Sequence, residues 1–370
     1  MFTLEKNGKV GEELCSGIHA AGNADVEIVD IVGLQGIGVV YDTASRVLCG
    51  TPTVAGDHVL RIHYRFALVG PDRPLLVSEC LLTVNPDPRS LWNDLQSAQS
   101  DPDWKPDTDK GYLQGDHGWR LAGASKRGRS HAHVGGFRED DFFLDVSAGW
   151  NVLAVADGAG SAMMSRRASQ IAVQKAGDVL KVALGDERGR NLEEAAAHLA
   201  SSSSPDRARA KTAAYHVLGT AALNAVKAIE GEAKTRGIPA KDYSTTLILG
   251  VHRRTSHGHL LASYWVGDGA VAAYQKKTRV EVLGKVDFGE FAGQTRFLDR
   301  SLVNSVEETM KRIRVELVPK FTSLVLMTDG ITDPKFETDW NLGDLSRWDA
   351  FWRELVPLLA DLQASVLVVG

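Results

Sequence analysis

The stretch Val152–Ala162 reads Val-Leu-Ala-Val-Ala-Asp-Gly-Ala-Gly-Ser-Ala and joins a short apolar run to a glycine-rich turn. An apolar run of this length that ends at glycine predicts a buried strand, so Asp157 stands at the end of that strand. Gly158 and Gly160 lack a Cβ atom and allow the backbone to approach a ligand closely, and Ser161 is placed to cap a following helix. We interpret the stretch as a strand that delivers Asp157 to a metal ion. The alternative is an ordinary Asp-Gly hairpin turn.

The composition is that of a globular protein with two or three domains. The chain has 370 residues, of which 44% are hydrophobic and 24% charged, as in ordinary folded proteins. The formal net charge of −5 gives no reason to expect nucleic acid or an acidic membrane as a partner. No apolar run approaches the roughly 20 residues that span a bilayer, and the first residues lack the apolar core of a signal peptide. Because the three cysteines show no Cys-x-x-Cys spacing, they indicate free thiols and a cytoplasmic protein.

Short alternating apolar runs separated by turn residues fill the first quarter of the chain. Their spacing predicts an all-β sandwich over residues 1–86. Within it, the segment Gly-Thr-Pro-Thr-Val-Ala-Gly of Tyr41–Ile62 resembles a signature of immunoglobulin-like domains in bacterial multidomain proteins. Such modules usually bind a partner or act as spacers, and the alternative is a β cap on the neighbouring domain. The expected strands are Val26–Val32, Gly38–Tyr41, Val59–Leu68 and Leu75–Val84.

Residues 87–118 contain several prolines and no sustained apolar period. Pro88, Pro102 and Pro106 stand among Asp, Ser, Lys and Trp residues, a composition typical of a partly extended linker. Trp92 and Trp104 are costly to leave in water, so we expect them to pack against a domain surface.

From residue 119 to residue 370, predicted strands are followed by helices and then by further strands. This order predicts an α+β domain with mostly antiparallel sheets instead of a βαβ repeat. The helices are rich in Ala and carry apolar residues at three- and four-residue spacing, which indicates one buried face. The expected strands are 141–146, 151–156, 244–252, 259–266, 270–275, 280–283, 313–318, 323–327 and 365–369, and the expected helices are 162–184, 191–201, 206–236 and 344–362.

Acidic residues gather at four places near predicted strand ends or glycine turns. Mg²⁺ and Mn²⁺ prefer carboxylate, carbonyl and water oxygens, so carboxylates from neighbouring strand ends can hold a two-metal centre. Two metal ions about 4 Å apart can activate a bridging water and clamp a phosphoryl oxygen for in-line hydrolysis. One cluster is a weak indication, whereas four favour such a centre more strongly. The clusters are Arg138–Asp141, Asp157–Gly158, Gly267–Gly269 and Thr328–Asp333.

Six motifs, taken in order, resemble those of the metal-dependent Ser/Thr protein phosphatases of type 2C, the PPM family. The chain is most similar to a divergent bacterial branch that carries Asp-Gly-Ala-Gly-Ser in place of Asp-Gly-His-Gly. The resemblance extends from about Arg120 to the C-terminus and implies an αββα sandwich, with two antiparallel sheets, helices outside, and metal ions at one edge. The motifs are Ser130–Phe143, Val155–Ala162, Ser244–Gly250, Val266–Gly269, Gly289–Leu298 and Leu326–Asp333.

The resemblance implies a role for each matching carboxylate. Asp157 would bridge two Mn²⁺ or Mg²⁺ ions, with the backbone carbonyl of Gly158 on one of them and Asp329 on the other. Asp140, with Glu139 beside it, would act through metal-bound waters to orient or deprotonate the nucleophile.

Two further aspartates have weaker assignments. Asp333 matches the position that supports a third, weaker metal ion, and Asp242 is a poorer candidate for its partner. For Asp268, we expect a structural role that ties together a turn near the site, and the alternative of an ordinary turn residue carries about equal weight.

The sequence departs from the family pattern where an arginine usually binds the substrate phosphate. The position that aligns with this arginine lies near Gly135, so this chain has a glycine there. His131 matches the Ser-His of the divergent branch and is a candidate to bind phosphate or to protonate the leaving alkoxide, although a lone histidine is as often structural. Other candidate phosphate ligands are Arg127, Arg129 and Arg138, because a guanidinium group suits phosphate oxygens.

A second departure concerns the last metal carboxylate. The family normally ends in Asp-Asp-x-Thr or Asp-Asn before its last strand, whereas this chain has Ala360-Asp-Leu-Gln-Ala-Ser365. Asp361 is the nearby carboxylate, at a spacing that differs by about two residues from the pattern. Either Asp361 replaces the usual ligand or the site has diverged.

These observations lead us to expect an immunoglobulin-like module followed by a PPM-type phosphatase domain. The expected reaction is Mn²⁺- or Mg²⁺-dependent hydrolysis of phosphoserine or phosphothreonine in a protein, with electrostatic stabilisation by the metal ions. The resemblance implies substrates phosphorylated by a bacterial Ser/Thr kinase encoded nearby, and the N-terminal module is a candidate site for a protein partner. The alternatives are a non-catalytic pseudophosphatase or regulatory binding module, and a metal-dependent phosphohydrolase that acts on small molecules.

Overall fold

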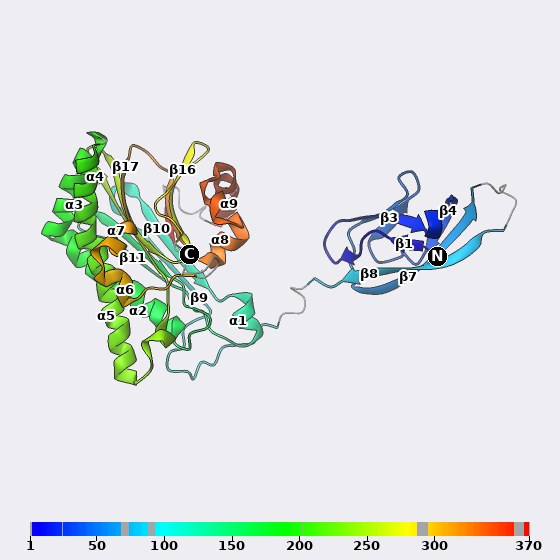
Figure 1. Ribbon diagram of the computed structural model, residues 1–370, viewed down its shortest axis with the longest axis horizontal. Coiled ribbons are helices and arrows are strands. Elements are labelled where there is room, and N and C mark those ends of the chain that lie inside the picture. Colours follow the sequence, from blue (N-terminus) through cyan, green and yellow to red (C-terminus); the bar gives the residue numbers. More distant parts are fainter. Residues whose placement is uncertain are drawn as a thin grey trace. The chain divides into compact units, whose positions relative to one another are not determined.

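The chain forms two compact units, Met1–Asn93 and Asp94–Gly370, which we describe separately (Figure 1). The computed structural model describes residues 2–23, 25–67, 74–87, 93–201, 203–286, 295–358 and 366–369.

The N-terminal unit consists of two four-stranded sheets packed face to face. Its strands are β1 (Phe2–Leu4), β2 (Gly8–Lys9), β3 (Leu14–Ala20), β4 (Val26–Val32), β5 (Val39–Asp42), β6 (Val47–Gly50), β7 (Gly56–Phe66) and β8 (Leu76–Asn85). The strand orders are β1-β3-β6-β5 and β2-β8-β7-β4. Leu48 in the first sheet and Leu60 and Leu82 in the second belong to one buried apolar cluster. The period-2 pattern of β7 and β8 therefore places alternate side chains in a shared core.

Gly50 shows why the Gly-Thr-Pro-Thr segment needs its first glycine. The residue has a φ of 134°, and a Cβ atom on it would lie 2.4 Å from the carbonyl oxygen of Gly38. Both the backbone conformation and this close approach exclude other residues. The strands β1, β2, β3 and β6 were not predicted, because they are short or carry few apolar residues in alternation.

The C-terminal unit contains a five-stranded and a six-stranded sheet. Its strands are β9 (Thr108–Gln114), β10 (Arg120–Lys126), β11 (Asp141–Ser147), β12 (Trp150–Ala156), β13 (Leu247–Thr255), β14 (Gly258–Val266), β15 (Ala270–Gln275), β16 (Arg279–Val282), β17 (Ile313–Val318), β18 (Ser323–Met327) and β19 (Val366–Val369). The strand orders are β11-β12-β13-β14-β17 and β16-β15-β18-β19-β10-β9.

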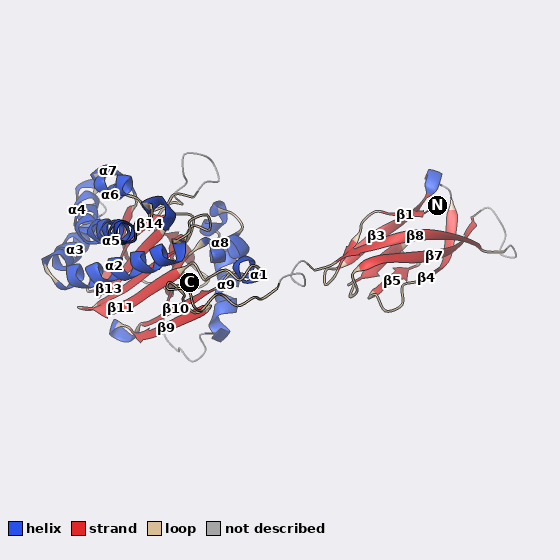
Figure 2. Ribbon diagram, turned by 90° about the horizontal axis from the view of Figure 1, so that it is seen from below, coloured by secondary structure: helices blue, strands red, loops and turns tan. Residues whose placement is uncertain are grey.

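Helices cover the outer faces of the two sheets (Figure 2). They are α1 (Arg129–His133), α2 (Ser165–Gly185), α3 (Glu187–Ala197), α4 (Ser204–Ala214), α5 (Thr220–Arg236), α6 (Arg300–Asn304), α7 (Val306–Lys311), α8 (Asp329–Phe336) and α9 (Leu345–Leu358). Across the described residues, no helix combines the length and the apolar character needed to cross a lipid bilayer.

Strand β12 lies at the centre of this layered arrangement. Val152 and Ala154 belong to the apolar cluster shared with helices α2, α3, α4 and α5, whereas Leu153 and Val155 belong to the cluster between the two sheets. Because both faces of β12 are buried, its sequence is continuously apolar instead of alternating. On the other sheet, Trp348 of α9 stacks on Tyr274 of β15 with ring centroids 6.1 Å apart.

Two parts of the predicted topology need correction. The six-stranded sheet is mixed, because β19 pairs in parallel with both β10 and β18. The chain passes from β18 through α8 and α9 before β19, and such a crossover permits parallel pairing. In addition, Thr108–Gln114, which we assigned to the linker, forms β9 and pairs antiparallel with β10. This edge strand is mostly polar and exposed, so it lacks the apolar alternation that marks a strand in a sequence.

Candidate functional site

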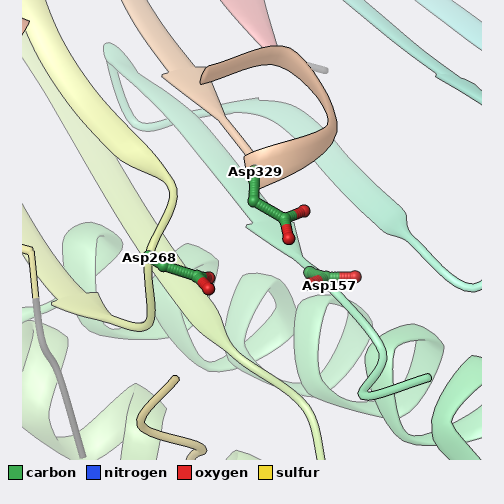
Figure 3. A group of neighbouring side chains, drawn as sticks. All are labelled: Asp157, Asp268 and Asp329. Carbon is green, nitrogen blue, oxygen red and sulfur yellow. The ribbon is translucent and has the colours of Figure 1, made fainter. Parts of the chain in front are cut away.

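Three aspartates from different strand ends form an acidic cluster at one edge of the C-terminal unit. Asp157 follows β12, Asp268 follows β14, and Asp329 follows β18 and begins α8. One carboxylate oxygen from each side chain lies within 4.8 Å of those from the other two. Figure 3 shows the three side chains at these neighbouring chain segments. We call Asp157, Asp268 and Asp329 the aspartate cluster.

The backbone around Asp157 is fixed by two threonines that directly precede β13. The Asp157 N–H donates to Thr246 Oγ1 at 2.9 Å, and the Asp157 carbonyl accepts from Thr245 Oγ1 at 2.7 Å and from the Thr246 N–H at 2.8 Å. Both threonines are buried. These bonds hold the aspartate in place without using its carboxylate, which stays free to face the cluster.

Gly158 is required by packing as well as by the turn. A Cβ atom at this position would lie 2.8 Å from the backbone of Ser165 at the start of α2. The glycine therefore allows α2 to begin directly beside the aspartate cluster, a close approach that any side chain would prevent.

The carboxyl groups of the aspartate cluster disfavour one another's charged forms. Burial, and then the nearby Asp140, Asp329 and Asp268, raise the pKa of Asp157 strongly. Burial and neighbouring aspartates also raise the pKa of Asp329 to about 6. The buried Oδ1 of Asp268 has no hydrogen-bond partner. Oxygen donors that repel one another and lack protein partners fit a hard divalent cation, which would satisfy them and favour their charged forms.

The raised pKa of Asp329 predicts a pH-dependent stability in the absence of metal. The folded protein keeps this proton up to about pH 6, whereas the ordinary value is 3.8. The unfolded chain therefore binds fewer protons in this window, and the free energy of unfolding should fall as the pH rises through it. In urea unfolding with chelator, we expect wild type to lose about 1–2 kcal/mol relative to Asp329→Asn between pH 4 and pH 7. Parallel pH curves for the two proteins would contradict this expectation.

Glu139 and Asp140 lie directly before β11, in a segment whose backbone carbonyls accept hydrogen bonds from two buried cationic side chains. Lys105, whose side chain is 5% exposed, donates from Nζ to the carbonyls of Glu139 at 3.2 Å and Asp140 at 2.9 Å. Arg138 donates to the same Asp140 carbonyl at 2.8 Å. The backbone of the acidic pair is thus anchored by buried cations, and its side chains are left to point elsewhere.

The carboxylates of this pair contact other residues of the site. Asp140 Oδ2 accepts a hydrogen bond from Thr328 at 2.8 Å, and Thr328 directly precedes Asp329 in the chain. Glu139 Oε2 accepts from Ser165 at 3.0 Å, and burial raises the pKa of Glu139. His131, on α1, has its Nδ1 atom 3.9 Å from Glu139 Oε1. The predicted catalytic residues Asp140, Glu139 and His131 are therefore brought together in one place.

A cavity of about 710 Å³ opens over these groups. Its wall combines carboxylates with cationic residues of the segment that leads into α1, and it has an apolar side made by Phe351 and Leu355. Such a mixture suits a ligand that carries an anionic group and an organic remainder. The polar lining includes Glu139, Asp140, Asp157, Asp329, His131, Lys126, Arg127 and Arg129.

The three arginines that are candidate phosphate ligands differ in their exposure and in how many protein partners their guanidinium groups have. The side chain of Arg138 is 2% exposed and donates to Pro106 and Asp140 carbonyls. Arg127 is also buried and is paired with Asp94 and Asp107. Arg129 is exposed in the cavity wall, and within the described ranges it has no hydrogen bond or ion pair. Arg138 and Arg127 are thus already engaged with other protein groups, which favours Arg129 among the three candidates.

The remaining predicted ligands lie at different places. Asp333 is exposed on α8, and its pKa is raised by burial and by Asp268. Asp242 lies in the 3₁₀ turn Ala240–Tyr243 and is not part of the aspartate cluster. Asp361 falls outside the described residues. Asp268, for which the sequence predicts a structural role in a turn near the site, is a member of the aspartate cluster. The signal that could have found it is the pattern of a strand followed by Asp-Gly, which also marks Asp157.

Comparisons with known proteins agree with the sequence motifs. A sequence model of the family described as protein phosphatase 2C matches residues 127–367. No curated protein sequence matches the chain.

Similar solved structures include a serine/threonine phosphatase from Staphylococcus aureus (13% identity, 74% of this chain and 93% of that chain, TM-score 0.35). Another is the S. agalactiae serine/threonine phosphatase (14% identity, 70% and 95%, TM-score 0.35). A third is a stage II sporulation E family protein from Thermanaerovibrio acidaminovorans (17% identity, 48% and 73%, TM-score 0.30). Because the sequence model of the family spans more than half of the 370 residues, the chain belongs to the protein phosphatase 2C family.

Proposed function

We propose that the protein hydrolyses phosphoserine and phosphothreonine in proteins with the help of Mn²⁺ or Mg²⁺. The observation that carries this proposal is the aspartate cluster, whose carboxylates repel one another and include a buried oxygen without a hydrogen-bond partner. Beside it lie the Glu139–Asp140 pair and the exposed cation of Arg129, in one cavity. This combination suits a phosphate ester better than it suits a neutral substrate.

The residues that would hold the metal ions are those of the aspartate cluster. When bound, two divalent cations supply Lewis-acid polarisation of the phosphoryl oxygens and of the attacking water. We propose Asp157 as the carboxylate shared between them, with Gly158 contributing its carbonyl oxygen. Asp333, whose pKa responds to the charge of Asp268, is our proposal for a further, weaker site together with Asp268.

The other residues of the cavity would position the substrate and move protons. Asp140, held by Thr328, and Glu139, held by Ser165, are placed to orient the nucleophilic water and to accept its proton. Arg129 would pair with the non-bridging phosphate oxygens. His131, whose Nδ1 atom lies 3.9 Å from Glu139 Oε1, would donate a proton to the leaving alkoxide.

The proposal predicts a strict metal requirement. Hydrolysis of para-nitrophenyl phosphate and of a phosphothreonine peptide should proceed with added Mn²⁺ and fall at least about 100-fold with chelator. The chelated sample should recover when excess Mn²⁺ is returned, which controls for unfolding. Turnover that is unaffected by chelator, or no turnover with any divalent cation, would contradict the proposal. The second of these results would favour the non-catalytic pseudophosphatase.

For the N-terminal unit, we infer an immunoglobulin-like module that binds a protein partner. The two-sheet sandwich and the glycine requirement at Gly50 support this assignment, although a sandwich fold does not by itself specify a function. We also propose that the substrates of the C-terminal unit are proteins phosphorylated by a bacterial Ser/Thr kinase.

A further inference from the structure

The C-terminal unit contains a second pocket, of about 600 Å³. One wall is formed by α5 and the turn Ala240–Ser244, and the other by the segment Thr295–Ser301. The cavity described above shares none of its lining residues with this pocket. The second pocket is therefore separate from that cavity, and its role has to be inferred from its own residues.

Both walls of this pocket are bonded to the aspartate cluster. Thr295, in one wall, donates its hydroxyl to Asp268 Oδ2. Ser244, in the other wall, is followed by Thr245, whose hydroxyl donates to the Asp157 carbonyl at 2.7 Å. The two walls are joined by a hydrogen bond of 2.8 Å from the Leu298 N–H to the Thr245 carbonyl. These hydrogen bonds hold the pocket next to the aspartate cluster. Residues of a substrate that flank a group bound at the cluster can therefore reach the pocket.

One side chain in the pocket wall has a hydrogen-bond donor without a partner. The Nε of Arg296 is buried and has no hydrogen-bond partner in the protein. An unmet buried donor costs free energy, and native proteins rarely leave one without a water or a ligand. The guanidinium group of Arg296 therefore points to a ligand that accepts hydrogen bonds.

The charges that line the pocket favour an anion. Arg300 is paired with Glu230, and Asp299 accepts hydrogen bonds from the first N–H groups of α6. Two further charged residues line the pocket, Arg296 and Lys241. Neither forms an ion pair within the described ranges. The pocket therefore offers positive charge beside apolar walls that include Ile229 and Phe297.

We propose that this pocket binds an acidic side chain, Asp or Glu, of the phosphoprotein substrate close to its phosphorylated residue. A carboxylate can accept from the Arg296 guanidinium in a charge-assisted contact. The inference rests on the proposed function, because it takes the aspartate cluster as the place where the phosphate binds. It adds a preference among phosphorylated sites, which the cluster by itself does not supply.

The test compares two phosphothreonine peptides that differ only in Glu or Gln residues on both sides of the phosphorylated threonine. For each protein, kcat/KM on each peptide is divided by kcat/KM on para-nitrophenyl phosphate, which has no flanking residues. Wild type should prefer the Glu peptide by at least about tenfold, and Arg296→Gln should remove most of that preference. Arg254→Gln, an exposed arginine near the far end of β13, is the matched control and should keep it.

A binding measurement separates this inference from the proposed function. If no protein hydrolyses para-nitrophenyl phosphate with any divalent cation, the proposed function fails. The fluorescence anisotropy of the same two labelled peptides then decides the pocket. Tighter binding of the Glu peptide that is lost in Arg296→Gln supports the inference, whereas equal binding of both peptides, or a preference unchanged in that variant, overturns it.

Discussion

Asp157→Asn is expected to lower Mn²⁺-dependent kcat/KM on para-nitrophenyl phosphate at least about 100-fold. The residue is placed among three other carboxylates, those of Asp140, Asp268 and Asp329, and their charges raise its pKa. Asparagine keeps the shape but removes the negative charge that a divalent cation requires. Its backbone bonds to Thr245 and Thr246 do not involve the side chain, so the fold should survive.

The same variant should separate stability from function. Without metal, burial and the neighbouring carboxylates disfavour the charged form of Asp157 in the folded protein, and asparagine avoids this cost because it does not ionise. The melting temperature in chelator should therefore be equal to or higher than that of wild type. Added Mn²⁺ should raise the melting temperature of wild type by mass action and that of Asp157→Asn much less.

The matched control is Asp145→Asn, an aspartate on β11 that is paired with Lys181. This variant should retain both activity and the metal response. More than about a tenth of wild-type activity in Asp157→Asn would count against its role at the metal centre.

Lys105→Met is expected to destabilise the C-terminal unit by about 3–5 kcal/mol. The ammonium group is buried and lies 3.1 Å from Asp141 Oδ2, in addition to its bonds to the Glu139 and Asp140 carbonyls. Burial is the main cause that lowers the pKa of Lys105 to about 8, against the effect of Asp141. Methionine preserves much of the side-chain volume but leaves the buried carboxylate with Arg138 at 3.7 Å as its remaining cation.

Urea unfolding followed by tryptophan fluorescence measures this loss. Lys110→Met, on the exposed edge strand β9, is the control and should change the free energy of unfolding by less than about 0.5 kcal/mol. At a urea concentration where both variants are folded, Lys105→Met should also show a lower kcat, because the turn that carries Glu139 and Asp140 loses its anchor. If Lys105→Met is as stable and as active as Lys110→Met, then Lys105 does not anchor the segment that carries Glu139 and Asp140.

Several local features could be predicted from the sequence because they depend on neighbouring residues. The continuous apolar run of β12 predicted a strand buried on both faces, and β4 matches the predicted range Val26–Val32. The polar edge strand β9 could not be found in this way, because its exposed face carries no apolar alternation. The long predicted helix over 206–236 is divided into α4 and α5 by a π-helical turn, Tyr215–Gly219, which periodicity does not reveal.

The sequence by itself determined which residue types stand at the strand ends, and so it pointed to Asp157 and Asp329 as metal ligands. Only the tertiary structure decided that Asp268 joins them, that Arg138 is buried and engaged, and that Lys105 lies behind the acidic pair. The physical reason is that periodicity and turn chemistry act over a few residues. Contacts between segments far apart in the chain depend instead on how sheets and helices pack, and that packing determines which charges are buried together.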